Sequence, residues 1–309
     1  MKKILFTFIF YNILFSGFGQ NQFHIGQYAI YQPFLNPAAI GVYENVNFAL
    51  LYKKQWTGLN GSPNLQGFNF NMPLGDRRLN YISFNVLNDK IGLSNSTEIS
   101  STYAYKVRSS LSSRLIFGLT ASLNLVSAQL SNASIIESND PVFTTNSPIF
   151  ALPNFKFGTY FYRHNFYMGF VVPNILENKV VEVGGSPSGY FGFNAKNMHY
   201  YLHAGYKIDF KKQRKLVISS LLKQVTGAPL QIDLNLNYML NPSFGIGTNI
   251  RSSKDAMLML SVYVLPELLL SYGYEYSFSK LSKYNNGTHE VLLVYKVKGT
   301  KDVIALPRF

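Results

Sequence analysis

Apolar and polar side chains alternate along most of this chain, in segments of about nine to twelve residues with turn-forming residues between them. The clearest segment runs from Leu230 to Leu240. Its apolar positions are Leu230, Ile232, Leu234, Leu236 and Tyr238, and its polar positions are Gln231, Asp233, Asn235 and Asn237. A helix, with its period of about 3.6 residues, would scatter both sets around its circumference, whereas a strand places them on opposite faces. We therefore predict a β-strand here and, by the same pattern, from Arg114 to Leu125.

Read in the same way, the chain contains about fourteen strand-like segments. They fall near residues 45–54, 65–73, 79–88, 97–107, 113–125, 153–163, 165–173, 198–208, 215–225, 229–240, 243–252, 256–264, 268–278 and 287–297. Bacterial single-chain barrels have an even number of antiparallel strands, because both ends of the chain finish on the periplasmic side. The pattern therefore predicts an all-β fold, a transmembrane antiparallel β-barrel of about fourteen strands.

The predicted connections alternate in length, which is typical of outer-membrane barrels with short periplasmic turns and longer external loops. If the first strand runs outward, the external connections include 55–64, 89–96, 126–152, 174–197 and 279–286. The periplasmic connections include the tight turns 163–165, 241–242 and 265–267, and the turn 209–214 of intermediate length. A soluble sandwich has no reason to keep such an alternation.

The two ends of the chain lie outside the alternating pattern. Lys2 and Lys3, followed by an apolar run from Ile4 to Phe15 and then by small residues, have the layout of a secretory signal peptide, so we expect export. The two prolines of the next segment, Pro33 and Pro37, argue against a ladder strand. The predicted organisation is a signal peptide at 1–19, a non-ladder segment at 20–44 that is a candidate plug, a barrel at 45–298 and a periplasmic tail at 299–309.

Composition supports a lipid-facing barrel. Charged residues make up only 14% of the chain, while Phe and Tyr number 25 and 22, as expected where charge on a lipid face is costly and aromatics line the interfaces. Some secreted β-sandwiches share this composition. The net charge is +13, but the basic residues lie in short turns such as 76–78 and 211–215 and not along a helix or an aromatic platform. We therefore expect anionic lipid head groups or acidic protein surfaces as partners, and no nucleic acid.

The sequence predicts no enzyme, no cofactor and no metal site. The chain has no cysteine, which excludes disulfides and thiolate metal ligands. On a strand, His199 and His203 would lie about 13 Å apart, too far to share a zinc ion. Ser271 and His289 fall on neighbouring predicted strands, but nothing in their spacing selects them as a catalytic pair. The Gly-rich stretch 184–189 lacks the lysine of a phosphate-binding loop, and we expect a flexible external loop there.

Three sequence blocks resemble a known family. The first spans Gln27 to Gly41 and contains Asn36-Pro37-Ala38 followed closely by Gly41. The second contains Tyr52, Gln55-Trp56, Gly58 and Gly61-x-Pro63, and it holds the only tryptophan of the chain. The third comprises Tyr274 to Ser277 and Gly287 to Glu290. In order and spacing, these blocks are similar to those of the PorP/SprF family of the bacterial type IX secretion and gliding system.

This resemblance implies an outer-membrane barrel that contacts membrane lipid, works with the periplasmic motor-ring proteins and binds the C-terminal domain of secreted cargo or a cell-surface adhesin. The motif and interaction candidates are Asn36, Pro37, Ala38, Gly41, Tyr52, Gln55, Trp56, Gly58, Gly61, Pro63, His289 and Glu290. They could lock the fold or touch the cargo. Ile40 departs from the smaller residue that the family often has, so packing there could differ.

Two other functions stay open at this point. A barrel of this strand count with an N-terminal plug also suits a FadL-like transporter of hydrophobic or small polar solutes. A secreted β-sandwich that never enters the membrane is the third possibility.

Overall fold

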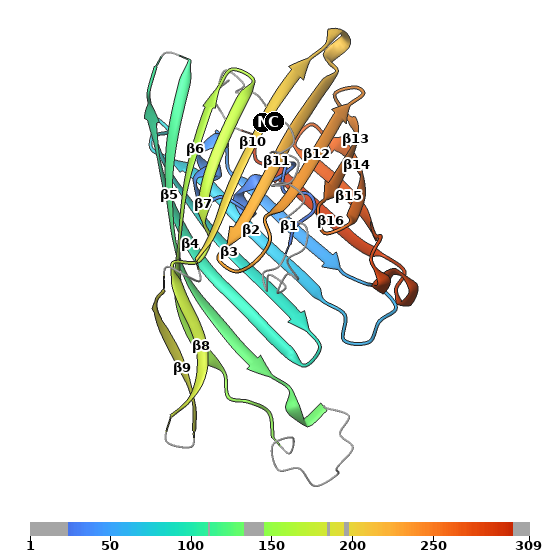
Figure 1. Cartoon of the computed structure of the whole chain (residues 1–309). Helices are drawn as coiled ribbons and strands as arrows, with labels where there is room; N and C mark the ends of the chain where they lie inside the picture. Colours follow the sequence, from blue (N-terminus) through green and yellow to red (C-terminus); the bar gives the residue numbers. More distant parts are fainter. Residues whose placement is uncertain (1–23, 111, 133–144, 184–185, 195–197, 299–309) are drawn as a thin grey trace, which may run out of the picture.

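A computed structural model of the chain describes residues 24–110, 112–132, 145–183, 186–194 and 198–298. In this part of the chain, fourteen strands form a closed antiparallel barrel (Figure 1). The barrel strands are β1 (Asn47–Lys54), β2 (Asn64–Leu74), β3 (Asn80–Ile91), β4 (Ser94–Arg108), β5 (Ser113–Ala128), β6 (Phe150–Arg163), β7 (Phe166–Val172), β10 (His199–Asp209), β11 (Lys215–Val225), β12 (Gln231–Met239), β13 (Phe244–Arg251), β14 (Asp255–Leu265), β15 (Leu268–Ser277) and β16 (Thr288–Lys296). The predicted fold is confirmed. The expected signal peptide and periplasmic tail lie outside the described residues.

The barrel closes between its first and last strands. β1 pairs with β2 on one side and with β16 on the other, in a register that sets Asn47 opposite Lys296 and Lys54 opposite His289. Because the ladder returns to its start, the strands leave no open sheet edge, and the sandwich interpretation is wrong. Among the described residues there is no helix long and apolar enough to cross a membrane.

The outward face of the barrel is apolar and the inward face is polar. On β12, Leu234 is 55% exposed on the outside, whereas the adjacent Asp233 is fully buried in the lumen. The predicted alternation from Arg114 to Leu125 appears on β5 in the same way, with exposed leucines and buried Thr120. Such a continuous outward apolar surface is what lipid covers in a membrane barrel.

The lengths of the connections divide the barrel into two ends. We call the end where β1 finishes, at Lys54, the outer rim, and the end where β1 starts, at Asn47, the inner rim. Inner-rim connections are short, as between β6 and β7 or between β14 and β15, whereas the outer rim carries the long stretch between β7 and β10. The inner rim is therefore assigned to the periplasm.

Two expectations for the outer rim were wrong in detail. The predicted loop 89–96 is mostly strand, because Asp89 pairs with Ser96 and Lys90 with Asn95. Above the lipid both strand faces are polar, so pairing continues where the alternation stops. The connection between β7 and β10 also contains a hairpin of β8 (Leu176–Val183) and β9 (Ser186–Phe193) outside the barrel ladder, so the loop expected at 184–189 is strand from Ser186 onward.

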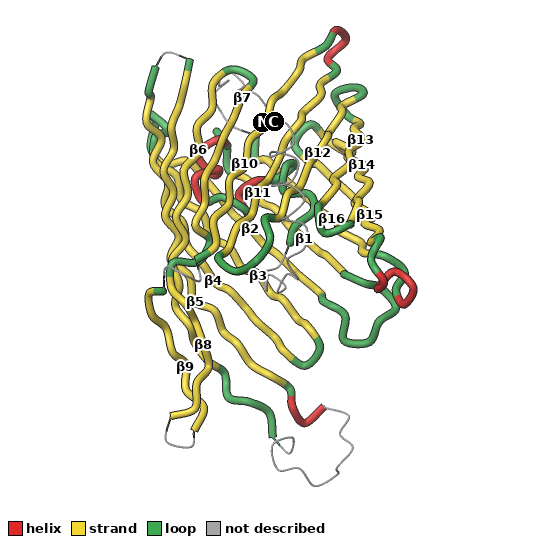
Figure 2. The backbone as a smooth tube through the Cα atoms, viewed as in Figure 1, coloured by secondary structure: helices red, strands yellow, loops and turns green. Residues whose placement is uncertain are grey.

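The N-terminal segment, residues 24–46, lies inside the barrel and forms much of its core. It contains two short 3-10 helices, η2 (Gln32–Phe34) and η3 (Pro37–Val42), which Figure 2 shows enclosed by the strands. Pro37 begins η3, where its missing N–H costs nothing. Almost every side chain from Ile25 to Gly41 is buried. The lumen is thus filled by the chain's own beginning, and the contacts of this segment define the candidate site.

Candidate functional site

The carboxylate of Glu290 holds the start of the N-terminal segment. Its two oxygens accept hydrogen bonds from the backbone N–H groups of Gly26 and Gln27, each at 2.9 Å. The side chain of Gln27 also donates to Glu290, to its carbonyl oxygen, at 3.1 Å. Glu290 is fully buried on β16, so these charge-assisted bonds replace the water that its carboxylate has lost.

Lys53 completes this anchor from the neighbouring strand. It stands directly opposite Glu290 in the pairing of β1 with β16, so both side chains share the lumen face. The Lys53 ammonium lies 3.6 Å from a Glu290 oxygen and donates to the His24 carbonyl at 2.9 Å. Segment, first strand and last strand therefore meet at one buried charge pair.

His24 joins the anchor to a second charged group. Lys223 on β11 donates to His24 Nδ1 at 2.7 Å, and His24 Nε2 lies 3.6 Å from Asp233 on β12. Burial above all, and then the positive charges of Arg251, Lys223 and Lys53, hold the pKa of His24 well below its usual value. Because the Lys223 ammonium can only donate, His24 Nδ1 accepts in this contact, as in a neutral imidazole.

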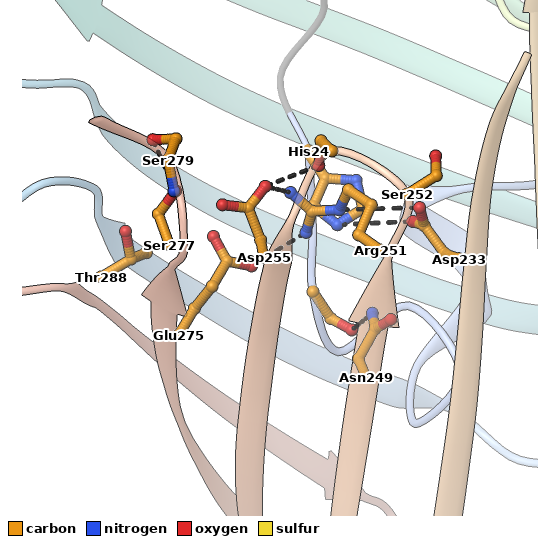
Figure 3. Close-up of polar contacts among 12 residues, drawn as sticks. His24, Asp233, Asn249, Arg251, Ser252, Asp255, Glu275, Ser277, Ser279 and Thr288 are labelled. Carbon is orange, nitrogen blue, oxygen red and sulfur yellow. Dashed lines mark hydrogen bonds and ion pairs between the residues drawn. The ribbon is translucent and has the colours of Figure 1, made fainter. Parts of the chain in front are cut away.

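Arg251 on β13 stands among three carboxylates. Its guanidinium lies 2.8 Å from Glu275, 3.4 Å from Asp255 and 3.6 Å from Asp233 (Figure 3). On the same strand, Asn249 donates to the Gly26 carbonyl at 2.8 Å. Removing such charges from water costs several kcal/mol per ion, so each of these groups needs its buried partners.

Asn36 forms a separate anchor on the opposite wall. Its Oδ1 accepts from the Ala38 N–H at 2.9 Å and caps η3, while its Nδ2 donates to the Thr159 carbonyl at 2.9 Å. The same Nδ2 lies 2.8 Å from His203 Nε2, which must accept because the amide nitrogen can only donate. Asn36 thus uses both ends of its amide while fully buried.

Pro37, Ala38 and Gly41 pack against the wall at close range. A Cβ at Gly118 on β5 would lie 2.8 Å from the Ala38 Cα, and a Cβ at Gly158 on β6 would lie 2.8 Å from the Pro37 Cδ. Any side chain at these two wall positions would displace the segment. The wall glycines and the first sequence block are therefore fitted to each other.

The second sequence block forms a loop that is hydrogen-bonded to the start of β16. The Trp56 N–H donates to Thr288 Oγ1 at 3.2 Å, and the Thr57 N–H donates to the Gly287 carbonyl at 2.8 Å. Gly58, at φ +96°, adopts the left-handed conformation that allows the loop to reverse. These bonds connect the second and third sequence blocks at the outer rim.

The rest of that loop forms backbone hydrogen bonds within itself and with the β3–β4 turn. The Gln55 N–H donates to the Pro63 carbonyl at 2.9 Å, and the Gly61 carbonyl accepts from the Gly92 N–H of the β3–β4 turn at 2.8 Å. Gln55, Trp56 and Pro63 also line a cavity of about 700 Å³ at the outer rim. The loop therefore forms part of the barrel mouth.

Two of the residues singled out from the sequence, Tyr52 and His289, face the outside of the barrel and not the lumen. Tyr52 points outward and is 44% exposed. His289 also faces outward, where its Nδ1 lies 2.7 Å from the Tyr272 hydroxyl. His289 and Glu290 thus occupy opposite faces of β16, as predicted from their adjacency, and the buried Ser271 faces away from His289.

The sequence pattern did not single out the charged residues of the lumen, which are His24, Lys53, Lys223, Asp233, Arg251 and Glu275. The alternation could have identified five of them, because Lys53, Lys223, Asp233, Arg251 and Glu275 each occupy an inward strand position. Charged residues at inward positions stand out in a chain with so few charges. The structure also shows, within the residues that it describes, no group of three His, Asp or Glu side chains arranged to bind a metal ion.

Two cavities flank the N-terminal segment. The cavity at the outer rim, of about 700 Å³, has His24, Ile25 and Tyr28 in its lining. A second cavity of about 330 Å³ at the inner rim has Ala29 and Ile30 in its lining. The segment therefore lies between two chambers, one toward each end of the barrel.

Comparisons with known proteins agree with this fold. A family model described as type IX secretion system membrane protein PorP/SprF matches residues 17–295. The solved structure of CymD, a monoaromatic hydrocarbon channel, is similar with a TM-score of 0.53, 10% identity and coverage of 93% of this chain and 96% of that chain. The toluene transporter TbuX of Ralstonia pickettii has a TM-score of 0.52, 9% identity and coverage of 92% and 98%. At such identities these structures share the fold alone, and no curated protein matches the chain.

Proposed function

The chain belongs to the PorP/SprF family of type IX secretion system membrane proteins, and on that premise we propose that it is a non-enzymatic anchor for secreted cargo or an adhesin. Its barrel fold and its family together indicate the outer membrane. In this proposal the outer face holds or helps to translocate the C-terminal domain of the cargo, and the inner rim couples to the periplasmic motor ring. Residues 1–19 act as the signal peptide for export.

The observation that carries the proposal is the occupied lumen. Glu290, Lys53 and Asn36 hold the N-terminal segment by buried hydrogen bonds and a charge pair, between strands on opposite walls. A barrel closed in this way is suited to present fixed surfaces at its two ends, and the segment acts as its plug. Cargo then binds outside the lumen and is not conducted through it.

The mouth of the barrel offers the surface for cargo. The loop from Gln55 to Pro63, the hairpin β8–β9 and the outer cavity lie together at the outer rim. Tyr190, Phe191 and Phe193 of that hairpin expose at least half of their surface, which is unusual for aromatic side chains that stand clear of lipid. They are candidates for contact with an exported domain.

Co-purification tests this function. Tagged protein extracted from outer membranes should retain both motor-ring components and a cargo C-terminal domain. Deletion of the outer hairpin, residues 176–193, should remove the cargo and leave the motor-ring components. Failure to recover either class of partner from wild-type membranes would contradict the proposal.

A second candidate is a transporter of hydrophobic or small solutes. It is favoured by the likeness of the barrel to CymD and TbuX and by the outer cavity, whose lining includes Phe34, Trp56 and Leu87. This function requires the segment to leave a path past Glu290. Retention of an apolar ligand through purification, together with conductance of the wild-type barrel, would favour it.

A further inference from the structure

The hairpin between β10 and β11 carries exposed basic side chains on the inner rim. Lys211, Lys212 and Arg214 are all exposed at its tip, and Arg163 is exposed at the end of β6, which β7 separates from β10. We call these four residues the basic arc. They lie on neighbouring turns, because β7 pairs directly with β10 and the Lys207 N–H donates to the Asn165 carbonyl at 2.8 Å.

The positive charge of the basic arc is not neutralised within the part of the chain that the structure describes. The acid nearest in sequence, Asp209, is held by Lys207 at 3.4 Å. None of the four residues of the basic arc forms an ion pair with a described side chain. Three of these like charges lie within four residues at the hairpin tip, so a partner of opposite charge would be attracted there.

The backbone of this hairpin includes two consecutive left-handed residues. Lys212 and Gln213 both adopt the left-handed conformation, at φ +61° and +59°, which glycine or asparagine adopts with less strain. At the outer rim, most left-handed positions carry glycine: Gly58, Gly61, Gly92, Gly227 and Gly287. Two other inner-rim turns have non-glycine residues in this conformation, Arg78 at φ +49° and His164 at φ +50°. The left-handed backbone therefore does not by itself assign a role to these side chains.

The tip of the hairpin extends beyond its neighbours. β10 continues to Asp209, past Tyr206, which lies opposite the first residue of β7. In Figure 1 the tip stands at the top of the view, beyond the β6–β7 and β12–β13 turns. Basic side chains that bind lipid head groups lie at the height of the membrane surface. The projection of this tip favours a protein in the periplasm over lipid.

A cavity lies directly beside the basic arc. The lining of the inner-rim chamber, of about 330 Å³, includes the charged residues Asp209, Arg214 and Lys215. Asp209 lies 3.4 Å from Lys207, so Arg214 and Lys215 leave the edge of the chamber positive. The apolar part of the lining comes from Ile30, Val217, Met239 and Leu269. A charged edge around an apolar hollow fits a protein segment in which acidic residues flank a large apolar side chain.

We propose that the basic arc and the adjoining cavity form a docking site for an acidic segment of a periplasmic protein. The acidic residues pair with Lys211, Lys212, Arg214 and Arg163, and an apolar side chain of the partner enters the cavity. This inference deepens the proposed coupling to the motor ring and rests on it for the assignment of the inner rim to the periplasm. Charge attraction would both speed the encounter and select against basic partners.

Photo-crosslinking in intact cells tests this site. Gln213 is replaced by p-benzoylphenylalanine in the full chain, and the crosslinked peptide is identified by mass spectrometry, with and without K211E/K212E/R214E. A matched control carries K280E/K283E in η8 (Lys280–Tyr284) at the outer rim. We expect a crosslink to an Asp- or Glu-rich peptide of a periplasmic protein. The triple change should reduce it by at least about tenfold, and the control should leave it unchanged.

A reciprocal charge swap decides whether the crosslink reports the proposed pairing. Lysines introduced at the crosslinked acidic positions of the partner should restore the crosslink to the triple variant. Crosslinks only to phospholipid, no crosslink, or a protein crosslink that resists charge reversal would each overturn the docking site. Heat-modified mobility on gels verifies that each variant forms a barrel.

The two proposals fail in different ways. If motor-ring proteins co-purify but position 213 crosslinks to none of them, the docking site is wrong and the coupling stands. If position 213 crosslinks in a charge-dependent manner to another acidic periplasmic protein, the docking site stands and the motor-ring partner is wrong. K212G provides an independent readout: it should keep or raise barrel stability while lowering the crosslink. An unchanged crosslink in K212G would contradict a role for that side chain.

Discussion

Gln27 donates two hydrogen bonds to Glu290: its backbone N–H to Glu290 Oε1 at 2.9 Å, and its side-chain Nε2 to the Glu290 carbonyl at 3.1 Å. One residue begins the segment inside the lumen and the other lies on the last strand of the barrel. Their contact can form only when the chain is nearly complete. Folding of the barrel and placement of the segment are therefore coupled.

Loss of the Glu290 carboxylate should release the start of the segment. E290A leaves Lys53 buried without its counter-charge, which costs about 3–5 kcal/mol in comparable sites. Because the chain has no cysteine, A29C reports this release by its rate of labelling with a thiol reagent. Labelling should be slow in the A29C barrel and fast in A29C/E290A. The control is A29C/H289A, which changes the outward-facing neighbour of Glu290 and should be labelled as slowly as A29C. Equal labelling rates in A29C, A29C/E290A and A29C/H289A would contradict the anchor.

Asn36 should contribute measurably to stability. N36A removes a helix cap, worth about 1 kcal/mol. It also leaves the buried His203 Nε2 without its Asn36 partner, which costs about 1–3 kcal/mol more. Denaturant unfolding in detergent measures the total. In a double-mutant cycle, N36A and H203A should couple, because the two side chains touch. Simple additivity would show that the Asn36–His203 contact carries no energy.

Filling a wall glycine should displace the segment without harming the wall. G118V places a side chain where the Ala38 backbone lies, so labelling of A29C should rise. A121V on the same strand faces outward and serves as the control, with labelling unchanged. If G118V leaves the segment protected, the close approach between η3 and β5 is not required.

Acid should loosen the segment through His24. Its pKa lies well below the usual value because of burial and of the nearby Arg251, Lys223 and Lys53. A group with a lowered native pKa contributes stability that is present above its unfolded pKa of about 6.5 and is lost as pH falls toward the native value. Labelling of A29C should therefore rise as pH falls below about 6.5, and H24Q should flatten this dependence. A profile that H24Q does not change would assign the effect to other groups.

A charge on the lipid face should be costly in a depth-dependent way. L234R places a cation near the middle of β12, where the cost is about 2–4 kcal/mol. Y238R lies on the same face near the inner rim and should cost about 0–1 kcal/mol. The free energy of unfolding, measured by denaturant titration in liposomes, compares the two variants with the wild type. Equal effects would contradict the membrane placement of this strand.

The barrel could be predicted because a lipid-facing wall imposes strict alternation on strands such as β12 and β5. The hairpin β8–β9 escaped prediction because it stands outside the lipid, where neither face must be apolar. The lumen site was only partly predictable. Glu290 and Asn36 entered through family resemblance, while Lys53 and Arg251 were overlooked. Which wall position faces which residue of the segment depends on barrel closure, and alternation within single strands does not contain that information.

The central claim is that the lumen is closed by its own N-terminal segment, and conductance in planar bilayers tests it most directly. The wild-type barrel should show no stable ion conductance, whereas E290A combined with G118V should show discrete channel openings as the segment leaves the wall. Sustained conductance by the wild-type protein, equal to that of the double variant, would contradict the account and favour a transporter.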